Sequence, residues 1–240
     1  MLSALLFAAL AADPTPRDAA DAPPLERDAA PPETLLGHER VFFTNFEGEN
    51  PAEAFAPTDE KAWEVAEQNG NHVFALKVRR SDYNPPVRSP HNIALVKDVT
   101  LTDTIVDVDV QSTITDYNHR DLCLFFNYQD PSHFYYVHLG KEADPHANQI
   151  FVVNGKPRTA ISKTTTDGTP WTDEWHHARV VRNAKTGEIA VYFDDMKTPA
   201  MTAVDKTFTH GQVGVGSFDD SGAFDNLAVY GTKADGLDAE

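Results

Sequence analysis

Apolar and polar residues alternate with a period of two along much of this chain. Between Ile105 and Gln111, three valines alternate with Asp107 and Asp109, and the segment Glu188–Asp195 follows the same pattern. Successive side chains of a β-strand point to opposite faces, so strict alternation indicates a strand with one buried face. The pattern therefore predicts strands that cover a core on one side only.

Short strands of this kind recur through the chain, and turn-forming pairs such as Asn69-Gly70 and Asn154-Gly155 separate them. No stretch of useful length has the period of a helix. The remaining strands are predicted at Arg40–Glu47, His72–Arg79, Asn92–Lys97, Asp121–Tyr128, His133–Leu139, Gln149–Asn154, Trp175–Arg182, Gln212–Phe218 and Phe224–Tyr230. This number and spacing predict an all-β fold, a two-sheet antiparallel sandwich.

The two ends of the chain differ from this body. Residues 1–12 contain an apolar run and the sequence Ala9-Leu10-Ala11, which is typical of a cleaved signal peptide. Residues 13–36 are rich in Ala, Pro and acidic residues, which predicts a disordered linker. Residues 233–240 are predicted to form a disordered acidic tail. We therefore expect one domain over residues 37–232 in a secreted protein, periplasmic or extracellular.

Charge and cysteine content narrow the range of partners. The formal net charge of −17 argues against nucleic acid as a partner. No apolar run reaches the length of about 18 residues that a membrane helix needs, so we expect no membrane insertion. Cys123 is the single cysteine, so no intramolecular disulfide is possible. It lies in an apolar run, which predicts a buried core thiol. We expect the protein to be a monomer.

Three segments of the C-terminal half carry a family resemblance. They are Trp175–Val180, with the pattern W-x-H-x-x-V, Gly187–Asp194, with the pattern G-x-I-x-V-Y-x-D, and the pair formed by Gly211–Gly216 and Phe224–Val229. They resemble the concanavalin A-like and laminin-G-like jelly-roll superfamily and, more loosely, its 3-keto-disaccharide hydrolase-like domains. The resemblance implies a concanavalin A-like jelly roll. The superfamily contains lectins, adhesion modules, glycoside hydrolases and polysaccharide lyases, so the fold alone does not name an activity.

Paired carboxylates are the first chemistry to look for, because most glycoside hydrolases use two. Jelly-roll enzymes similar to laminarinases carry E-x-D-x-E on one strand, and the nearest match here is Asp107-Val108-Asp109, without either glutamate. The two aspartates lie on the strand face opposite the valines. That face is either a solvated exterior or a sugar-binding surface, and the hydrolase activity of that family does not carry over.

Groups suited to elimination from a uronate are concentrated in the middle of the chain. Such a reaction needs a base, an acid and a group that neutralises the sugar carboxylate, and His138, Tyr136 and Arg120 are the predicted catalytic residues. Tyr136 and His138 share one strand face, whereas His133 and Tyr135 share the other, and periodicity leaves open which face is a groove. Predicted substrate-binding residues are Arg88, His91, Asn92, His119, Tyr128, His133, Tyr135, Gln149 and Asn154.

The sequence also contains candidate ligands for a metal ion. The histidines form no zinc motif, since there is no H-E-x-x-H and no cysteine pair. Glu47 closes the first predicted strand and Asp225 opens the last, and these strands are neighbours in jelly rolls. Carboxylate oxygens suit calcium, so the sequence predicts a structural calcium ion held by Glu47 and Asp225.

These observations lead to one functional hypothesis and its alternative. The chain is expected to bind a poly- or oligosaccharide on its concave sheet and to cleave a glycosidic linkage, by hydrolysis or elimination. The alternative is a non-catalytic, lectin-like binding or adhesion module, because aromatic rings and planar polar groups also bind sugars without turnover.

Overall fold

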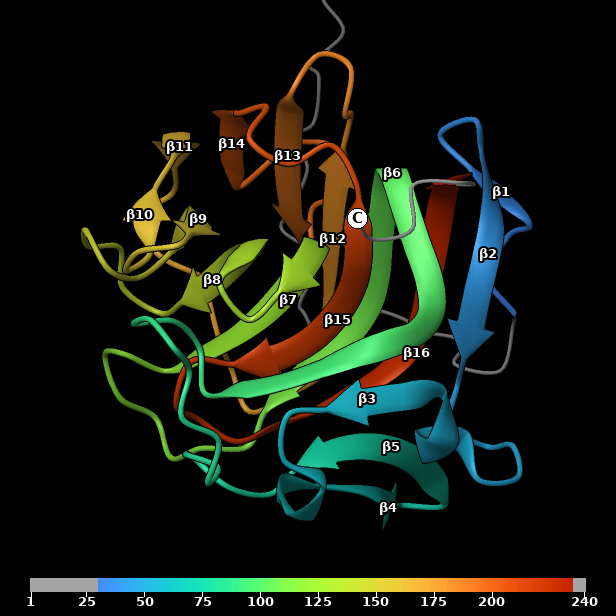
Figure 1. Ribbon diagram of the computed structural model, residues 1–240. Coiled ribbons are helices and arrows are strands. Elements are labelled where there is room, and N and C mark those ends of the chain that lie inside the picture. The colour runs from blue at the N-terminus through green and yellow to red at the C-terminus, as the bar shows by residue number, and fades with distance from the viewer. Residues whose placement is uncertain (1–29, 235–240) are drawn as a thin grey trace, which may run out of the picture. The chain divides into compact units, whose positions relative to one another are not determined.

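The computed structural model describes residues 30–234, which form antiparallel strands and two short 3-10 helices, Pro51–Ala54 and Glu60–Ala62 (Figure 1). The strands are β1 (Thr34–Leu35), β2 (His38–Thr44), β3 (Phe55–Pro57), β4 (Trp63–Gln68), β5 (Asn71–Leu76), β6 (Asn92–Ser112), β7 (Asp121–Asp130), β8 (His133–Gly140), β9 (Gln149–Asn154), β10 (Thr159–Ala160), β11 (Ser162–Thr165), β12 (His176–Arg182), β13 (Glu188–Phe193), β14 (Met201–Val204), β15 (Gly211–Ser217) and β16 (Gly222–Lys233).

Strand β6 belongs to two sheets. Its first half pairs with β3 and β15, and β15 continues the first sheet through β7, β8, β9 and β10. Its second half pairs with β16 and β12, and β12 continues the second sheet through β13, β14 and β11. Strands β2 and β5 pair with β16. Figure 1 shows β6 as a long bent strand beside β15 and β16.

The main core is formed by the facing sides of these two sheets. Val106, Val108 and Val110 are fully buried in it, together with Val137 of β8 and Val191 of β13. Alternation along β6 therefore places the valines inside, as the sequence predicts. The structure confirms an all-β, two-sheet antiparallel jelly roll.

A second apolar cluster covers the other side of the first sheet. Phe125, Phe134, Tyr136 and Phe151 are buried there, and Val87 from the segment 77–91 packs against them. Tyr135, by contrast, belongs to the core between the sheets. Tyr136 and His138 thus lie on the outer side of this sheet, which resolves the choice that periodicity left open.

The predicted strands need two kinds of correction. The segments predicted separately around residues 92–97 and 105–111 are one strand, β6. Six strands of the described residues were not predicted, β1, β3, β4, β10, β11 and β14, and of these β4 forms a hairpin with β5. Asn69 and Gly70, both with positive φ, make the two-residue turn of that hairpin. Strand β4 pairs only with β5, and most of its side chains are at least partly exposed. Its sequence therefore carries only a weak alternation of apolar and polar residues.

The predicted signal peptide lies outside the described residues, as do most of the predicted linker and tail. At the end of the linker, Thr34–Leu35 form β1 and pair with β2, because their backbone groups bond to Glu39 and His38. Within residues 30–234, no helix has the length and apolar character needed to cross a membrane.

Candidate functional site

Phe218 follows directly after β15 and is the centre of a group of polar side chains. The guanidinium carbon of Arg158 lies 4.0 Å from the centroid of its ring, and that of Arg88 lies 6.0 Å away. The rings of His91 and His138 lie 5.9 and 5.8 Å from it, centroid to centroid. Since Phe218 is only 7% exposed, these groups cover it almost completely. We call Phe218, Arg88, His91 and Arg158 the Phe218 rim.

Arg158 is held in place by aromatic rings. Its guanidinium also lies 4.8 Å from the Phe151 centroid, and its Nη1 donates a 2.9 Å hydrogen bond to the Tyr136 hydroxyl. Its Nε is buried and has no hydrogen-bond partner among the described residues. Within residues 30–234, neither Arg158 nor Arg88 forms an ion pair, so both guanidinium charges remain available to an anion.

Backbone contacts fix the loop that carries Arg88 and His91. The His91 N–H donates to the Phe218 carbonyl at 3.0 Å, and the Arg158 N–H donates to the Arg88 carbonyl at 3.1 Å. The amide of Asn92 accepts from the Ser81 N–H and donates to a neighbouring carbonyl of the same loop. Burial lowers the pKa of His91, so its imidazole is neutral at neutral pH.

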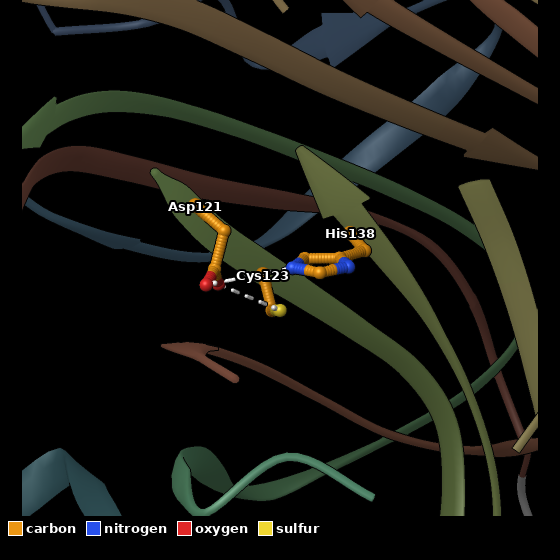
Figure 2. Close-up of side chains that lie close together, drawn as sticks. All are labelled: Asp121, Cys123 and His138. Carbon is orange, nitrogen blue, oxygen red and sulfur yellow. Dashed lines mark hydrogen bonds and ion pairs between the residues drawn. The ribbon is translucent and has the colours of Figure 1, made fainter. Parts of the chain in front are cut away.

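Asp121, Cys123 and His138 lie together under the Phe218 rim (Figure 2). Cys123 of β7 pairs directly with His138 of β8, and Asp121 is two residues away on the same strand face. Asp121 Oδ2 lies 3.4 Å from His138 Nε2, and Asp121 Oδ1 lies 3.7 Å from Cys123 Sγ. Ser217 and the Phe218 N–H each donate a 2.9 Å hydrogen bond to Asp121 Oδ1.

All three groups of this cluster are buried, which changes their protonation. Burial raises the pKa of the Cys123 thiol well above its ordinary value, so the thiol is protonated and unreactive as it stands. Burial by itself would raise the pKa of Asp121, but the nearby His138 and the hydrogen bonds from Phe218 and Ser217 lower it. Asp121 is therefore a buried carboxylate.

Asp220 lies beside this cluster and has the opposite shift. Burial and, to a smaller extent, the negative charge of Asp121 raise its pKa to about 6. Its carboxylate accepts hydrogen bonds from the Tyr117 hydroxyl, from Arg79 Nε and from the Asp121 N–H. These bonds tie the loop before β7 to the loop after β15.

The structure buries the three predicted catalytic residues. Tyr136 is fully buried beneath Arg158, and Arg120 is bonded to Ser112 and to the Asp173 carboxylate. His138 is 5% exposed. Since none of them opens to solvent, this arrangement gives no support to a direct role on a saccharide, and their catalytic assignment stays a prediction.

The predicted substrate-binding residues separate into two groups. Arg88 and His91 meet at the Phe218 rim. Five of the others already have partners within the fold. Asn92 anchors the loop, Tyr128 stacks on Phe134, His133 bonds to Asp130, Tyr135 bonds to Asp205 and the Phe208 N–H, and Gln149 donates to the Asp144 carbonyl. The last two are exposed, His119 beside Tyr117 and Asn154 opposite His133 on the neighbouring strand.

The carboxylates of the predicted calcium site already have hydrogen-bond partners. Glu47 accepts from the backbone N–H of His72 and contacts its Nδ1 at 2.7 Å. Asp225 accepts from the Asn71 amide and from the Asn226 N–H. Strands β2 and β16 are neighbours, as predicted, but β2 ends at Thr44, so Glu47 lies beyond the strand that it was predicted to close. The described residues give the calcium site no added support, and it stays a prediction.

Asp107 and Asp109 lie on the outer side of the second sheet and hold a histidine between them. His177 Nε2 lies 2.8 Å from Asp107 Oδ1, and its Nδ1 lies 2.7 Å from Asp109 Oδ1. Arg179 also bonds to Asp107. Burial alone lowers the pKa of His177, but its bonds to the two carboxylates outweigh this and raise it to about 9. This face therefore contains an ion-pair network.

Sequence interpretation missed Phe218, Arg158, Asp121 and Asp220. The sequence contains one signal for this cluster. Asp121 and Cys123 are two positions apart in a predicted strand, so their side chains lie on the same face. The approach of Arg158 and Phe218 depends on loops of the first sheet, and no local pattern reports it.

The jelly-roll fold of this protein is similar to that of several solved structures. The carbohydrate binding module CBM66 from Bacillus subtilis matches with a TM-score of 0.52 and 16% identity, over 74% of this chain and 95% of that one. A Bacillus subtilis protein of unknown function with a galectin-like fold matches with a TM-score of 0.52 and 13% identity, over 80% and 95%.

A putative glycosyl hydrolase from Parabacteroides distasonis matches with a TM-score of 0.51 and 12% identity, over 79% of this chain and 99% of that one. The sequence matches no protein-family model and no curated protein. These similarities establish the fold. The narrower resemblance to 3-keto-disaccharide hydrolase-like domains stays a prediction.

Proposed function

We propose that this protein binds an acidic oligosaccharide at the Phe218 rim and does not cleave it. The observation that carries the proposal is the convergence of two arginines, Arg88 and Arg158, on one aromatic ring in a chain of net charge −17. Neither arginine has an ion-pair partner among the residues that the structure describes. A guanidinium binds a carboxylate or sulfate through two parallel hydrogen bonds, and its planar shape fixes the orientation of that group.

Two further features support this site. His91 presents a neutral imidazole beside the arginines, which suits a sugar hydroxyl. The loop that carries Arg88 and the turn between β9 and β10 that carries Arg158 are joined by a backbone hydrogen bond, so the rim is organised before a ligand arrives. The fold is similar to that of a carbohydrate binding module, which supports a saccharide as the ligand.

Binding without cleavage fits the burial of the polar groups beneath the rim. A glycosidic bond is broken by an acid and a base that reach the sugar. Tyr136 and His138 lie under Arg158 and Phe218 and cannot make that contact in this arrangement. The alternative, elimination from a uronate, would require the rim to open.

Removing both guanidinium groups is expected to abolish most of the binding. The double variant Arg88→Ala/Arg158→Ala should bind uronate or sulfated oligosaccharides roughly 10- to 100-fold more weakly, because each lost charged hydrogen bond contributes about 1.5 kcal/mol or more. Isothermal titration calorimetry at fixed salt measures the change. Thermal melts check that the variant remains folded.

Lys163→Ala/Lys185→Ala is the matched control, since it removes the same charge from exposed positions away from the rim. Equal losses in both double variants would mean that net charge, and not the rim, drives binding. Equal affinity for neutral and acidic sugars would contradict the acidic ligand. Ultraviolet absorption of unsaturated products and release of reducing ends test for cleavage, and either one would contradict binding without turnover.

A further inference from the structure

We propose that Asp121, Cys123 and His138 form a binding site for a divalent transition-metal ion of the zinc class. One ligand atom from each residue lies within 4.8 Å of the other two, and the three residues lie on the adjacent strands β7 and β8 (Figure 2). This site is independent of the saccharide proposal. It uses residues buried beneath the Phe218 rim and not the rim itself.

The strongest reason is the orientation of the His138 imidazole. Its Nδ1 lies 2.8 Å from the carbonyl oxygen of His146. A carbonyl can only accept, so Nδ1 carries a proton there, and Nε2 is the ring nitrogen turned toward Asp121. A histidine that ligates a metal is normally held in this way, by a hydrogen bond from its other ring nitrogen.

Nε2 and the Asp121 carboxylate face each other in the interior, and a positive charge between them stabilises both. Nε2 is buried, makes no well-formed hydrogen bond among the described residues and lies 3.4 Å from Asp121 Oδ2. A buried polar atom without a partner costs about 1–3 kcal/mol. A positive ion between the lone pair and the carboxylate would satisfy both atoms.

The separations fit tetrahedral coordination. Zinc bonds of about 2.0 Å to oxygen and nitrogen and 2.3 Å to sulfur place neighbouring ligand atoms about 3.3 to 3.6 Å apart. The cluster shows 3.4 Å between Asp121 Oδ2 and His138 Nε2, and one ligand atom from each of the three residues lies within 4.8 Å of the other two. The Cys123 thiolate would have to move closer to the other two atoms to complete the geometry. A fourth position would remain for water or another ligand.

Charge and the surrounding hydrogen bonds also agree with this site. On binding, the Cys123 thiol would lose its proton to solvent, and one thiolate and one carboxylate would neutralise a divalent ion. A neutral complex is far less costly to bury than a single charge. Ser217 and the Phe218 N–H already hold Asp121 Oδ1, so Oδ2 is left for the metal.

Cobalt is the probe that tests this directly. The full chain, stripped with a chelator, is titrated with Co²⁺ and then with Zn²⁺. One Co²⁺ per chain should bind and give the thiolate-to-cobalt charge-transfer band and the strong visible absorption of tetrahedral cobalt. Zn²⁺ should displace it, and Ca²⁺ should not, because calcium avoids sulfur and nitrogen ligands.

Variants identify the ligands. Cys123→Ser should remove the charge-transfer band, and His138→Gln should weaken cobalt binding at least about 10-fold. His133→Gln is the control, because that histidine is partly exposed and paired with Asp130. Near-ultraviolet circular dichroism shows whether each variant is folded. The same band in Cys123→Ser, or no cobalt absorption from the folded wild-type chain, would overturn the proposal.

Thermal stability gives a second readout. If zinc binds only the folded chain, adding it at about 100 times its Kd should raise the Tm by about 5 to 10 °C. The rise should be lost in Cys123→Ser and retained in His133→Gln. An equal rise in Cys123→Ser would place the zinc elsewhere and contradict the assignment.

Discussion

Replacing Gly216 by alanine is expected to destabilise the fold by more than about 4 kcal/mol. Gly216 lies near the C-terminal end of β15, between β6 and β7, and is paired with Ile93 of β6 and Cys123 of β7. A Cβ at this position would lie 1.9 Å from the Asn92 carbonyl oxygen and 3.1 Å from the Phe125 ring. The oxygen belongs to the backbone of the neighbouring strand, so it cannot move without disrupting the sheet.

Urea denaturation of the variant measures this loss. Gly48→Ala is the control, because a Cβ there meets nothing within 4 Å, and its stability should stay within about 0.5 kcal/mol of the wild type. Saccharide binding at the Phe218 rim should be lost together with the fold, because Gly216 lies two residues before Phe218. A Gly216→Ala variant within about 1 kcal/mol of the wild type would show that β15 adapts, contrary to this strand pairing.

The stability of the protein is expected to fall as the pH rises from about 6.5 through 9, and His177 is the reason. Its pKa is raised to about 9 in the folded state, above the ordinary value of 6.5. A raised pKa means that the folded state holds the proton more tightly, so this stabilisation is complete below pH 6.5 and is lost as the pH passes 9. The loss should be about 2 to 3 kcal/mol, because His177 is mostly buried between Asp107 and Asp109.

His177→Gln isolates this contribution. The variant should be less stable than the wild type at pH 6, and the difference should shrink toward zero at pH 10. The charged groups that face His177 are Asp107 and Asp109 from β6, Arg179 from β12, and Asp194, which accepts a hydrogen bond from the His177 N–H. Burial by itself would raise the pKa of Asp107, but its bonds to His177 and Arg179 lower it. A difference between variant and wild type that does not change with pH would show that His177 is not charged in the folded state.

Part of the site was visible in the sequence because it follows strand alternation. Tyr136 and His138 were predicted to share a face, and Asp107 and Asp109 were predicted to lie opposite the buried valines. Both predictions are confirmed. Arg88 and His91 were also selected for their chemistry, and they meet at the Phe218 rim. Alternation reports which side of a strand a residue occupies, and it is a local property.

The other half of the site depends on contacts between distant segments. Arg158 reaches Phe218 from 60 residues away along the chain, and the segment 77–91 covers the outer face that was expected to be open. Because this loop and Arg158 bury Tyr136, a pair predicted to act on a sugar lies beneath the surface. The position of loops over a sheet is set by packing and not by residue period.

The sequence by itself determined the class of fold and the inward side of each regular strand, because hydrophobic periodicity and turn residues act over a few positions. Only the tertiary structure decided that β6 joins two sheets, that Cys123 lies opposite His138 and that two arginines meet over the Phe218 ring. Strand register and loop placement minimise the free energy of the whole domain, so the chemistry they bring together cannot be found in any single segment.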